Sequence, residues 1–421
     1  MKLKRILLCL LFIPCGLYRI VAQSDTVKIM HYNLLSFGQP CGSISTTDKY
    51  NWLGEILEHA QPDIMTVNEL GPNVVLGNGI IQLSFDYTSG ISQGDLTNEA
   101  GSNFVNQIFY RNDKFGYAGV EIINGIVRDI NVYKLYPLAS AQPGGDTLFF
   151  HCIVAHLKAG NSTSDQTQRS NAANNIINWI AVNPSARNVL LLGDLNVGGS
   201  SEMAFQNLIN PTNPANRLLD PINKQNGWGG ASNAIYHTQS TRSSFIDCGS
   251  TGGMDDRFDM ILAKEAVING TAGMQYVPDS YHALGNDGNS YNTALGCAGN
   301  NTVPNNVCSR LQLMSDHLPV IAEFSLNLST SIEDDLIPGL SLHISPNPFG
   351  DILSIGLTEA TPIFQNVEVE LTDIWGRKVR NASVTASSLL EFDTADLPTG
   401  LYVLQVSDRQ GRRISRKIVK R

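Results

Sequence analysis

The sequence predicts an α/β fold that is followed by a small all-β domain. From about residue 26 to 326, short apolar runs typical of strands alternate with a few amphipathic helices. A polar linker then interrupts this pattern, and beyond it short alternating strands are separated by turn residues. A chain of 421 residues, 42% of them hydrophobic, is long enough to bury more than one core.

Residues 1–23 are predicted to be a signal peptide. A basic start at residues 2–5 is followed by an apolar stretch at 6–17, which is too short and too interrupted to anchor the chain in a membrane. Cys15 leaves open a lipoprotein, which the preceding Pro14 disfavours. We therefore expect an exported protein with no stable membrane insertion.

Residues 24–327 are predicted to form the larger domain. Its strand candidates are 27–34, 62–68, 104–110, 127–136, 147–157, 188–195, 257–263 and 318–325. Helices between strands, together with hairpin-like strand pairs, favour a mixed α/β sandwich over a purely parallel, doubly wound sheet. Three long segments rich in Gly, Asn and Ser are predicted to be surface loops: 71–103, 222–252 and 279–310.

Two helices are expected in this domain. The first is predicted to begin near Asp48 as its N-cap and to bury the face that carries Trp52 and Ile56. The second is predicted over 165–182, where apolar residues such as Ile176 recur at helical spacing.

After the linker at 328–341, residues 342–421 are predicted to form a small all-β domain of their own. Val367, Val369 and Leu371 alternate with acidic residues, as expected for a strand with one buried face.

Five cysteines remain once residues 1–23 are removed: Cys41, Cys152, Cys248, Cys297 and Cys308. Export makes disulfides chemically possible. Cys297 and Cys308 flank a loop rich in Asn and Gly and are predicted to pair, whereas Cys152 lies in an apolar run and is expected to be a buried thiol. The odd count leaves at least one thiol free or paired between chains, and a bond between Cys41 and Cys248 is left open.

The larger domain is acidic, since residues 24–339 carry a net charge of about −14 within a chain of −9. Such a domain does not bind polyanions through its bulk charge. If the substrate is a phosphodiester, a divalent cation and local Arg, Lys and His side chains must supply the attraction.

Polar and ionisable residues follow several predicted strands, where catalytic groups are expected because strand ends open onto a crevice. Asn33, Glu69 and His156 each end an apolar run. A carboxylate in this place suits a hard cation that takes oxygen ligands. For His156, the alternation of side chains along a strand leaves a core histidine as the alternative.

Further along the chain, Asp194 and Asn196 stand two residues apart in an extended segment, so both project to one side. Asp316 and His317 directly precede the last predicted strand. The sequence contains no His-Glu-x-x-His motif, no phosphate-binding loop ending in Gly-Lys-Ser/Thr and no Cys-x-x-Cys pair. Zinc is therefore not expected as the main ion.

In this order, the strand-end residues resemble those of the endonuclease/exonuclease/phosphatase superfamily of metal-dependent phosphodiesterases. The resemblance covers roughly residues 26–326 and implies a four-layer αββα sandwich. It makes Glu69 the primary ligand of a magnesium ion, with Asn33 or Asp316 nearby. Manganese or calcium are the alternatives to magnesium.

The same resemblance implies roles for other residues. Asp194 and His317 position and deprotonate a water, while His156 and Asn196 hold the phosphate. Asp259 orients His317, because a His–Asp pair fixes the tautomer of the imidazole and raises its basicity. Asp259 is preferred over its acidic neighbours at 255 and 256, since three apolar strand residues follow it.

Asn33, Arg111 and Lys158 are the candidates for contacts with the substrate, and the last two are the weaker ones. A surface ion pair explains Arg111 as well, and a solvated side chain explains Lys158 almost as well.

The C-terminal residues resemble the sorting domain of the type IX secretion system of the Bacteroidetes. The resemblance rests on the segments 345–349 (Ser-Pro-Asn-Pro-Phe), 373–378, 397–402 and the basic tail 417–421. It implies an Ig-like β-sandwich over 342–421, the type IX machinery as a partner, and passage through the periplasm and outer membrane. An ordinary accessory β-domain is the alternative.

The sequence thus predicts a secreted, magnesium-dependent phosphodiester hydrolase, with extracellular nucleic acid as the favoured substrate. A sphingomyelinase- or inositol-phosphatase-like phosphoesterase is the alternative within this class. A non-catalytic surface binding protein is the alternative outside it, and it is disfavoured because every main site position is filled.

Overall fold

The computed structural model describes residues 24–73, 90–140, 147–224, 227–246, 248–327, 340–359, 366–373, 376–385, 389–408 and 413–421. The segment predicted to be a signal peptide and most of the predicted linker lie outside these residues.

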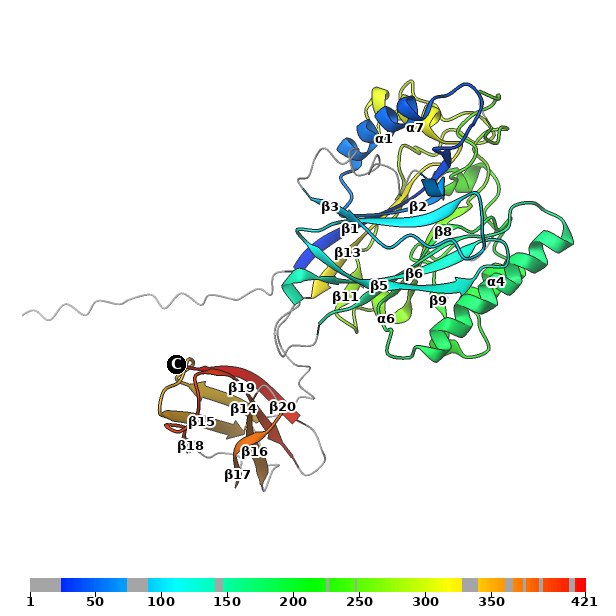
Figure 1. Cartoon of the computed structure of the whole chain (residues 1–421). Coiled ribbons are helices and arrows are strands. Elements are labelled where there is room, and N and C mark those ends of the chain that lie inside the picture. Colours follow the sequence, from blue (N-terminus) through cyan, green and yellow to red (C-terminus); the bar gives the residue numbers. More distant parts are fainter. Residues whose placement is uncertain are drawn as a thin grey trace, which may run out of the picture.

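The larger part of the chain is built on two mixed β-sheets (Figure 1). The first contains β1 (Ser24–Phe37), β2 (Ile64–Leu70), β3 (Ile91–Gln93), β4 (Val105–Arg111), β11 (Met274–Tyr276), β12 (His282–Ala283) and β13 (Val320–Asn327). The second contains β5 (Phe115–Asn124), β6 (Asp129–Pro137), β7 (Phe150–His156), β8 (Val189–Asp194), β9 (Leu218–Leu219) and β10 (Asp259–Lys264). β1 pairs in parallel with β2, and β7 with β8, while the other neighbours pair antiparallel. The predicted α/β class with mixed strand pairing is confirmed.

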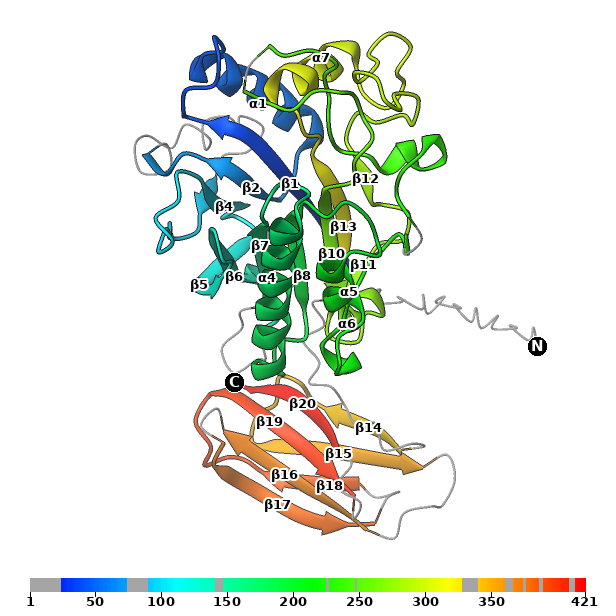
Figure 2. The same ribbon diagram turned by 90° about the vertical axis from the view of Figure 1, so that its right-hand side faces the viewer.

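The helices of this part are α1 (Thr46–Ala60), α4 (Thr163–Val182), α5 (Met203–Ile209), α6 (Glu265–Ile268) and α7 (Asn305–Met314), with short 3-10 turns at Leu138–Ser140, Pro214–Asn216 and Ala231–Tyr236. Figure 1 shows α1 and α7 together beside the first sheet, and Figure 2 shows α4 and α5 beside the second.

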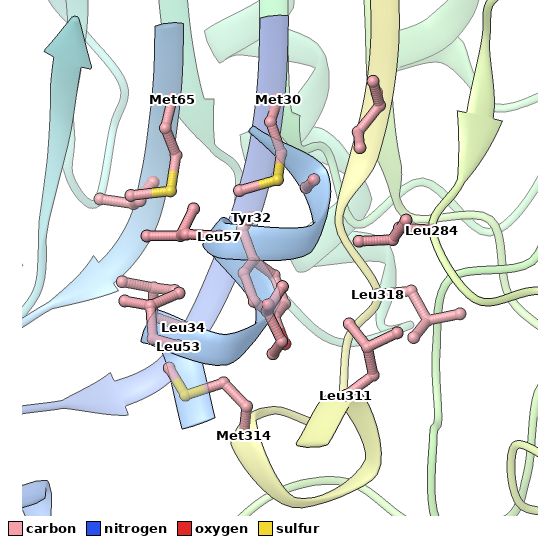
Figure 3. Packing of buried hydrophobic residues seen from close by; sticks show 14 of the residues in the cluster. Met30, Tyr32, Leu34, Leu53, Leu57, Met65, Leu284, Leu311, Met314 and Leu318 are labelled. Atoms are coloured by element: carbon pink, nitrogen blue, oxygen red, sulfur yellow. The ribbon is translucent and has the colours of Figure 1, made fainter. Parts of the chain in front are cut away.

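Three hydrophobic clusters hold these elements together. One lies between the first sheet and its helices. It includes Met30 of β1, Leu57 of α1 and Leu311 of α7 (Figure 3). A second lies between the two sheets and contains Ile29, the strand neighbour of Met30. Successive residues of a strand point to opposite faces, so β1 contributes to both clusters.

The third cluster joins the second sheet to its helices and includes Leu191 of β8, Ile176 of α4 and Phe205 of α5. Both sheets are therefore buried on both faces. In the central strands, such as β7 and β8, polar side chains reach the cleft at the strand ends.

Capping residues set the beginnings of the two long helices. The N-cap of α1 is Ser45, whose hydroxyl accepts a hydrogen bond from the backbone N–H of Asp48, so the prediction of Asp48 as N-cap is wrong. The helix α4 begins after Ser162 with a capping box, in which Ser162 and Asp165 satisfy each other's backbone N–H groups.

Two of the predicted surface loops are only partly loops. Helix α7 begins within the segment 279–310, and its four buried side chains, including Cys308, were masked by polar neighbours. In the segment 222–252, His237 and Thr241 are fully buried. The polar composition predicted exposure here, but both side chains reach backbone carbonyl oxygens inside the fold.

Two disulfides form, Cys41–Cys248 and Cys297–Cys308, and Cys152 is a buried free thiol. This agrees with the predicted pair and settles the pairing that the sequence left open.

The C-terminal region is rich in β-structure. One sheet contains β14 (Leu340–Ser345), β15 (Ile352–Glu359) and β18 (Leu389–Asp393), and the other contains β16 (Val367–Asp373), β17 (Lys378–Val384), β19 (Gly400–Ser407) and β20 (Arg413–Lys420). Side chains from both sheets, such as Leu353 and Leu404, form a hydrophobic cluster that includes no residue of the first 327.

Candidate active site

Strand register brings three predicted site residues into one row at the end of the second sheet. His156 of β7 pairs with Asp194 of β8, and Asp194 pairs with Asp259 of β10. Side chains of paired residues on neighbouring strands lie about 5 Å apart on the same face. The row therefore follows directly from where these strands end.

Asn33 links this row to the first sheet. Its Nδ2 donates to Oδ2 of Asp194 at 3.1 Å and to Oε1 of Glu69 at 3.2 Å. Its Oδ1 accepts from the backbone N–H of Leu35 at 3.0 Å, and this bond identifies the oxygen of the amide. The geometry thus gives Asn33 the role of holding two carboxylates, and the ligand role predicted for it stays a prediction.

Glu69 is held in an unusual backbone conformation, with φ of +56°. Ser36, which also has a positive φ, donates its backbone N–H to Oε2 of Glu69 at 3.0 Å. Left-handed conformations of non-glycine residues cost about 1–3 kcal/mol each and tend to cluster at functional sites. The side chain of Glu69 stays partly exposed and lines a cleft.

Asp194 is buried between two imidazoles. Its Oδ2 lies 3.6 Å from Nε2 of His156 and 3.8 Å from Nε2 of His317. Burial raises the pKa of Asp194 to about 7, and this rise is opposed by the positive charge of His317 and increased by Asp259 and Glu69. A carboxylate with such a pKa can take up and release a proton near neutral pH.

His317 and Asp259 form a tight pair. Nδ1 of His317 lies 2.7 Å from Oδ2 of Asp259, and both side chains are buried. Burial by itself lowers the pKa of His317, but the charges of Asp259, Asp316 and Asp194 outweigh it and hold the pKa well above its usual value. The pair therefore directs Nε2 of His317 toward Asp194 and the cleft.

His156 is nearly buried, but it lines the cleft and so differs from an ordinary core histidine. Its Nδ1 has no hydrogen-bond partner. Burial lowers the pKa of His156 well below its usual value, with the charge of Arg128 adding to the effect. The imidazole is therefore neutral at physiological pH.

These residues surround a cleft of about 570 Å³. Glu69, His156, Asp194, Asn196, Asp316 and His317 all line it. Asn196 has a φ of +52° and donates its backbone N–H to Oδ1 of Asp194 at 3.1 Å. No lysine or arginine appears among the cleft-lining residues in the part of the chain that the structure describes.

The structure does not bring Arg111 and Lys158 into this cleft. Arg111 pairs with Asp113, and its Nη1 lies 3.5 Å from Asp63, at the opposite end of β2 from Glu69. Nζ of Lys158 lies 3.0 Å from Asp165 at the start of α4. Each cation is thus engaged by a nearby carboxylate, so the substrate-binding roles predicted for them find no support in the geometry.

Several site residues were missed by sequence reasoning. Nε2 of Gln239 lies 2.6 Å from Nε2 of His317 and 3.3 Å from Oδ2 of Asp316, and the same oxygen of Asp316 accepts from the backbone N–H of Ser250 at 2.6 Å. Both Gln239 and Ser250 fall in the segment predicted to be a surface loop. Neither residue type at such a place gives a signal of function.

Two further missed residues are basic. His31 is fully buried, and its Nε2 lies 3.9 Å from Oδ1 of Asp259. Arg128 lies 3.4 Å from the carbonyl oxygens of His156 and Leu157. Burial lowers the pKa of Arg128, while the charges of Glu69 and Asp194 oppose this shift, which places the guanidinium within their field.

The donors of the cleft suit a hard divalent cation. Glu69 and Asp316 offer carboxylate oxygens, and Oδ1 of Asp316 is buried without a hydrogen-bond partner. Among the described residues no three His, Cys, Asp or Glu side chains form a metal cluster by themselves.

Comparison with known proteins shows what the two parts of the chain resemble. Residues 343–421 match the model of the secretion system C-terminal sorting domain. The chain therefore carries a type IX sorting domain, which directs it to the cell surface or the extracellular space. In the described part of the chain, no helix is long and apolar enough to span a membrane.

No curated protein matches the chain. Among solved structures, the chain is similar to an endonuclease/exonuclease/phosphatase from Bacteroides vulgatus, at 14% identity and a TM-score of 0.47, over 72% of this chain and 99% of the other. It is similar to D. rerio TDP2 complexed with a single-strand DNA product, at 16% identity and 0.46, over 71% and 99%. It is also similar to the human Nocturnin catalytic domain with bound sulfate, at 15% and 0.44, over 72% and 97%.

Proposed function

We propose that this chain is a secreted, metal-dependent phosphodiester hydrolase that acts by attack of water on phosphorus. The observation that carries the proposal is the buried His317–Asp259 pair, whose Nε2 faces a second carboxylate, Asp194, in one cleft. A carboxylate held beside such a pair can take the proton of a water next to a bound phosphate.

In the proposed reaction, water attacks phosphorus in line with the leaving oxygen, and the bond between phosphorus and that oxygen breaks. Asp194, whose pKa burial raises to about 7, takes the proton that the water loses, and the His317–Asp259 pair orients that water beside it. His156, which is neutral, donates a hydrogen bond to a phosphoryl oxygen, and Asn196 holds another. Asn33 keeps Asp194 and Glu69 in place.

A magnesium ion held by Glu69, with Asp316 as a second carboxylate, would neutralise charge on the phosphoryl and leaving oxygens. The residues of the chain then have to orient the phosphate and the water, because the cleft itself carries an excess of negative charge. Manganese or calcium are alternative ions for the same donors.

Nucleic acid is the first substrate class to test, since a histidine–carboxylate pair and a second histidine suit a nuclease. A single observation favours another class. The described cleft lining contains no lysine or arginine, although a long polyanionic strand needs cations beside several phosphates. A lipid or sugar phosphodiester with one charge is therefore the second candidate.

Removing divalent metal is expected to abolish hydrolysis of bis-para-nitrophenyl phosphate by the full chain, and adding magnesium or manganese should restore it. The reason is that the cleft carboxylates repel a phosphate unless a cation lies between them. Release of para-nitrophenolate in excess chelator, before and after metal addition, measures this. Full activity in the chelator would rule out the proposed chemistry. Plasmid DNA, RNA and sphingomyelin, assayed in parallel, distinguish the substrate classes.

A chain that ends at Leu328 is expected to hydrolyse the same substrate as fast as the full chain. Every proposed site residue precedes residue 318, and the C-terminal strands have a hydrophobic cluster of their own. In the native host, the shortened protein should remain in the periplasm, which fractionation and immunoblotting can show. Normal secretion of the shortened chain, or loss of activity in a folded one, would contradict this division of roles.

A further inference from the structure

The Cys41–Cys248 disulfide joins two segments, each of which lies close to a backbone N–H that is donated to a carboxylate of the cleft. Ser36 donates to Glu69 at 3.0 Å, and Ser250 donates to Asp316 at 2.6 Å. The two bonded cysteines are 207 residues apart in the sequence. They are, however, only a few residues from the two donors.

The end of β1 has a backbone conformation that surrounding contacts must hold. Leu35 and Ser36 both have positive φ values, +46° and +55°, which turn the N–H of Ser36 toward Glu69. The buried ammonium of Lys49 donates to the carbonyl oxygens of Leu34 and Leu35. Left-handed conformations persist in non-glycine residues only when surrounding contacts hold them.

The second loop has little apolar packing of its own. Phe245 is 75% exposed and Ile246 is 42% exposed, so the tip of the loop is not anchored in a core. After these residues, the loop runs along the cleft, which Cys248, Ser250 and Gly252 line. Backbone hydrogen bonds of Gly253 with Ser240 and Arg242 hold the base of this loop, and a second anchor nearer its tip would keep the N–H of Ser250 on Asp316.

The disulfide provides this anchor and contacts the first donor residue as well. The backbone N–H of Cys248 lies 3.3 Å from Sγ of Cys41, and Sγ of Cys248 lies 3.7 Å from the hydroxyl of Ser36. One covalent link therefore connects the segment that carries Ser36 with the segment that carries Ser250.

We propose that the Cys41–Cys248 disulfide is a positioning element of the cleft, which holds the backbone N–H groups of Ser36 and Ser250 on Glu69 and Asp316. The inference rests on the proposed function, because these two carboxylates are the donors assigned to the metal. The full activity of the enzyme then requires an oxidised disulfide, as the chain acquires on export from the reducing cytoplasm.

The second disulfide is a natural control. Cys297 and Cys308 are 11 residues apart and lie at the first hydrophobic cluster, between the sheet and its helices. Neither residue lines the cleft. Breaking this bond removes a covalent link without freeing either donor loop.

The test compares the full chain with two variants, C41S/C248S and C297S/C308S. We measure kcat and KM on bis-para-nitrophenyl phosphate and the affinity for manganese by calorimetry, with near-ultraviolet circular dichroism to follow the fold. In C41S/C248S, kcat and manganese affinity should each fall at least about tenfold with the fold retained, since misplacement of a site by about 1 Å costs up to about 10²-fold. C297S/C308S should change neither quantity by more than about twofold.

Chemical reduction provides a reversible version of the test. A phosphine attacks the S–S bond and breaks it, and one water then supplies the oxygen of the phosphine oxide and the two hydrogens of the thiols. Cys248 is exposed and open to the reagent. Activity and manganese affinity should fall together and return when air or oxidised glutathione restores the bond. Unchanged values in the reduced wild type, or equal losses in C297S/C308S, would overturn the proposal.

If C41S/C248S fails to fold, Ser250→Pro provides a second test. It keeps both cysteines and removes the backbone N–H that Ser250 donates to Asp316. It should show the same loss of manganese affinity, and unchanged affinity would overturn the proposal. An oxidised wild type that hydrolyses no diester would defeat the proposed function instead. Its manganese affinity, with and without the disulfide, would still test the positioning role.

Discussion

Replacement of His317 by alanine is expected to lower kcat on bis-para-nitrophenyl phosphate by about 10³-fold or more. The imidazole is held at 2.7 Å by Asp259 with its Nε2 turned toward Asp194, so its loss leaves Asp194, the base that takes the proton of the attacking water, without the group that positions it. A positioned general base contributes about 10²- to 10⁴-fold. Steady-state kinetics with saturating metal measure the effect. His282→Ala is the matched control, because His282 is an exposed histidine bonded to a backbone carbonyl, and it should leave kcat unchanged.

A double-mutant cycle shows whether His317 and Asp259 act as one unit. Asp259→Asn should cost less than His317→Ala, since the imidazole remains although its tautomer is no longer enforced. The double variant should cost far less than the product of the two single losses, because the second change removes a partner that has nothing left to orient. Multiplicative losses would show that the two residues act independently and that Asp259 is the wrong partner.

The second large effect is expected for Asp194→Asn, which should lower kcat by about 10³-fold with little change in folding. The amide keeps the shape of the carboxylate, but it can take up no proton. In the wild type, both carboxylate oxygens accept hydrogen bonds, one from Asn33 and one from Asn196. The NH₂ group of the new amide takes the place of one of these oxygens, so one of the two hydrogen bonds is lost. Burial raises the pKa of Asp194 to about 7, so the wild-type group exchanges protons near neutral pH, and this capacity is lost in the variant.

Asp256→Asn separates this role from a general effect of charge in the cleft. Asp256 also lines the cleft, and burial together with Asp255 raises its pKa to about 6. Among the ion pairs of the described residues, Asp194 lies beside His156 and His317, whereas Asp256 lies beside neither, so its replacement should cost less than about tenfold. Equal losses in the two variants would mean that the cleft responds to its total charge, and that Asp194 has no specific role.

The local pattern of the sequence was sufficient for the strands that carry the site. Each predicted strand run matches a strand of the structure to within a few residues, because burial on both faces leaves a continuous apolar run that a short sequence window detects. The polar residues at the ends of these runs were visible for the same reason. Asp194 and His317 stand out because each interrupts an apolar stretch. The α-helix at 305–314 was missed, since its polar residues hide an apolar face of four side chains.

Other features of the site depend on contacts that no local window contains. The hydrogen bond from Asn33 to Asp194 joins residues that are 161 positions apart. It shows that the amide of Asn33 holds a carboxylate, which the sequence alone did not indicate. Arg111 ends one apolar strand and Arg128 directly precedes another, so the two look alike in the sequence. The packing of the fold places Arg128 within the field of Glu69 and Arg111 beside Asp63. Gln239 and Ser250 gave no signal because a polar residue in a polar segment looks like solvent-exposed loop.

By itself, the sequence determined the class of fold, the residues at the ends of the strands, the Cys297–Cys308 pair and the sorting segment at the C-terminus. The first three follow from the composition and periodicity of short stretches of chain, and the sorting segment follows from its resemblance to a known domain. Only the tertiary structure decided which side chains share the cleft, how their protons are distributed and what the Cys41–Cys248 bond connects. The physical reason is that strand register and the packing of sheet on sheet set distances and burial between remote residues. The pKa of a buried group such as Asp194 depends on those distances and that burial.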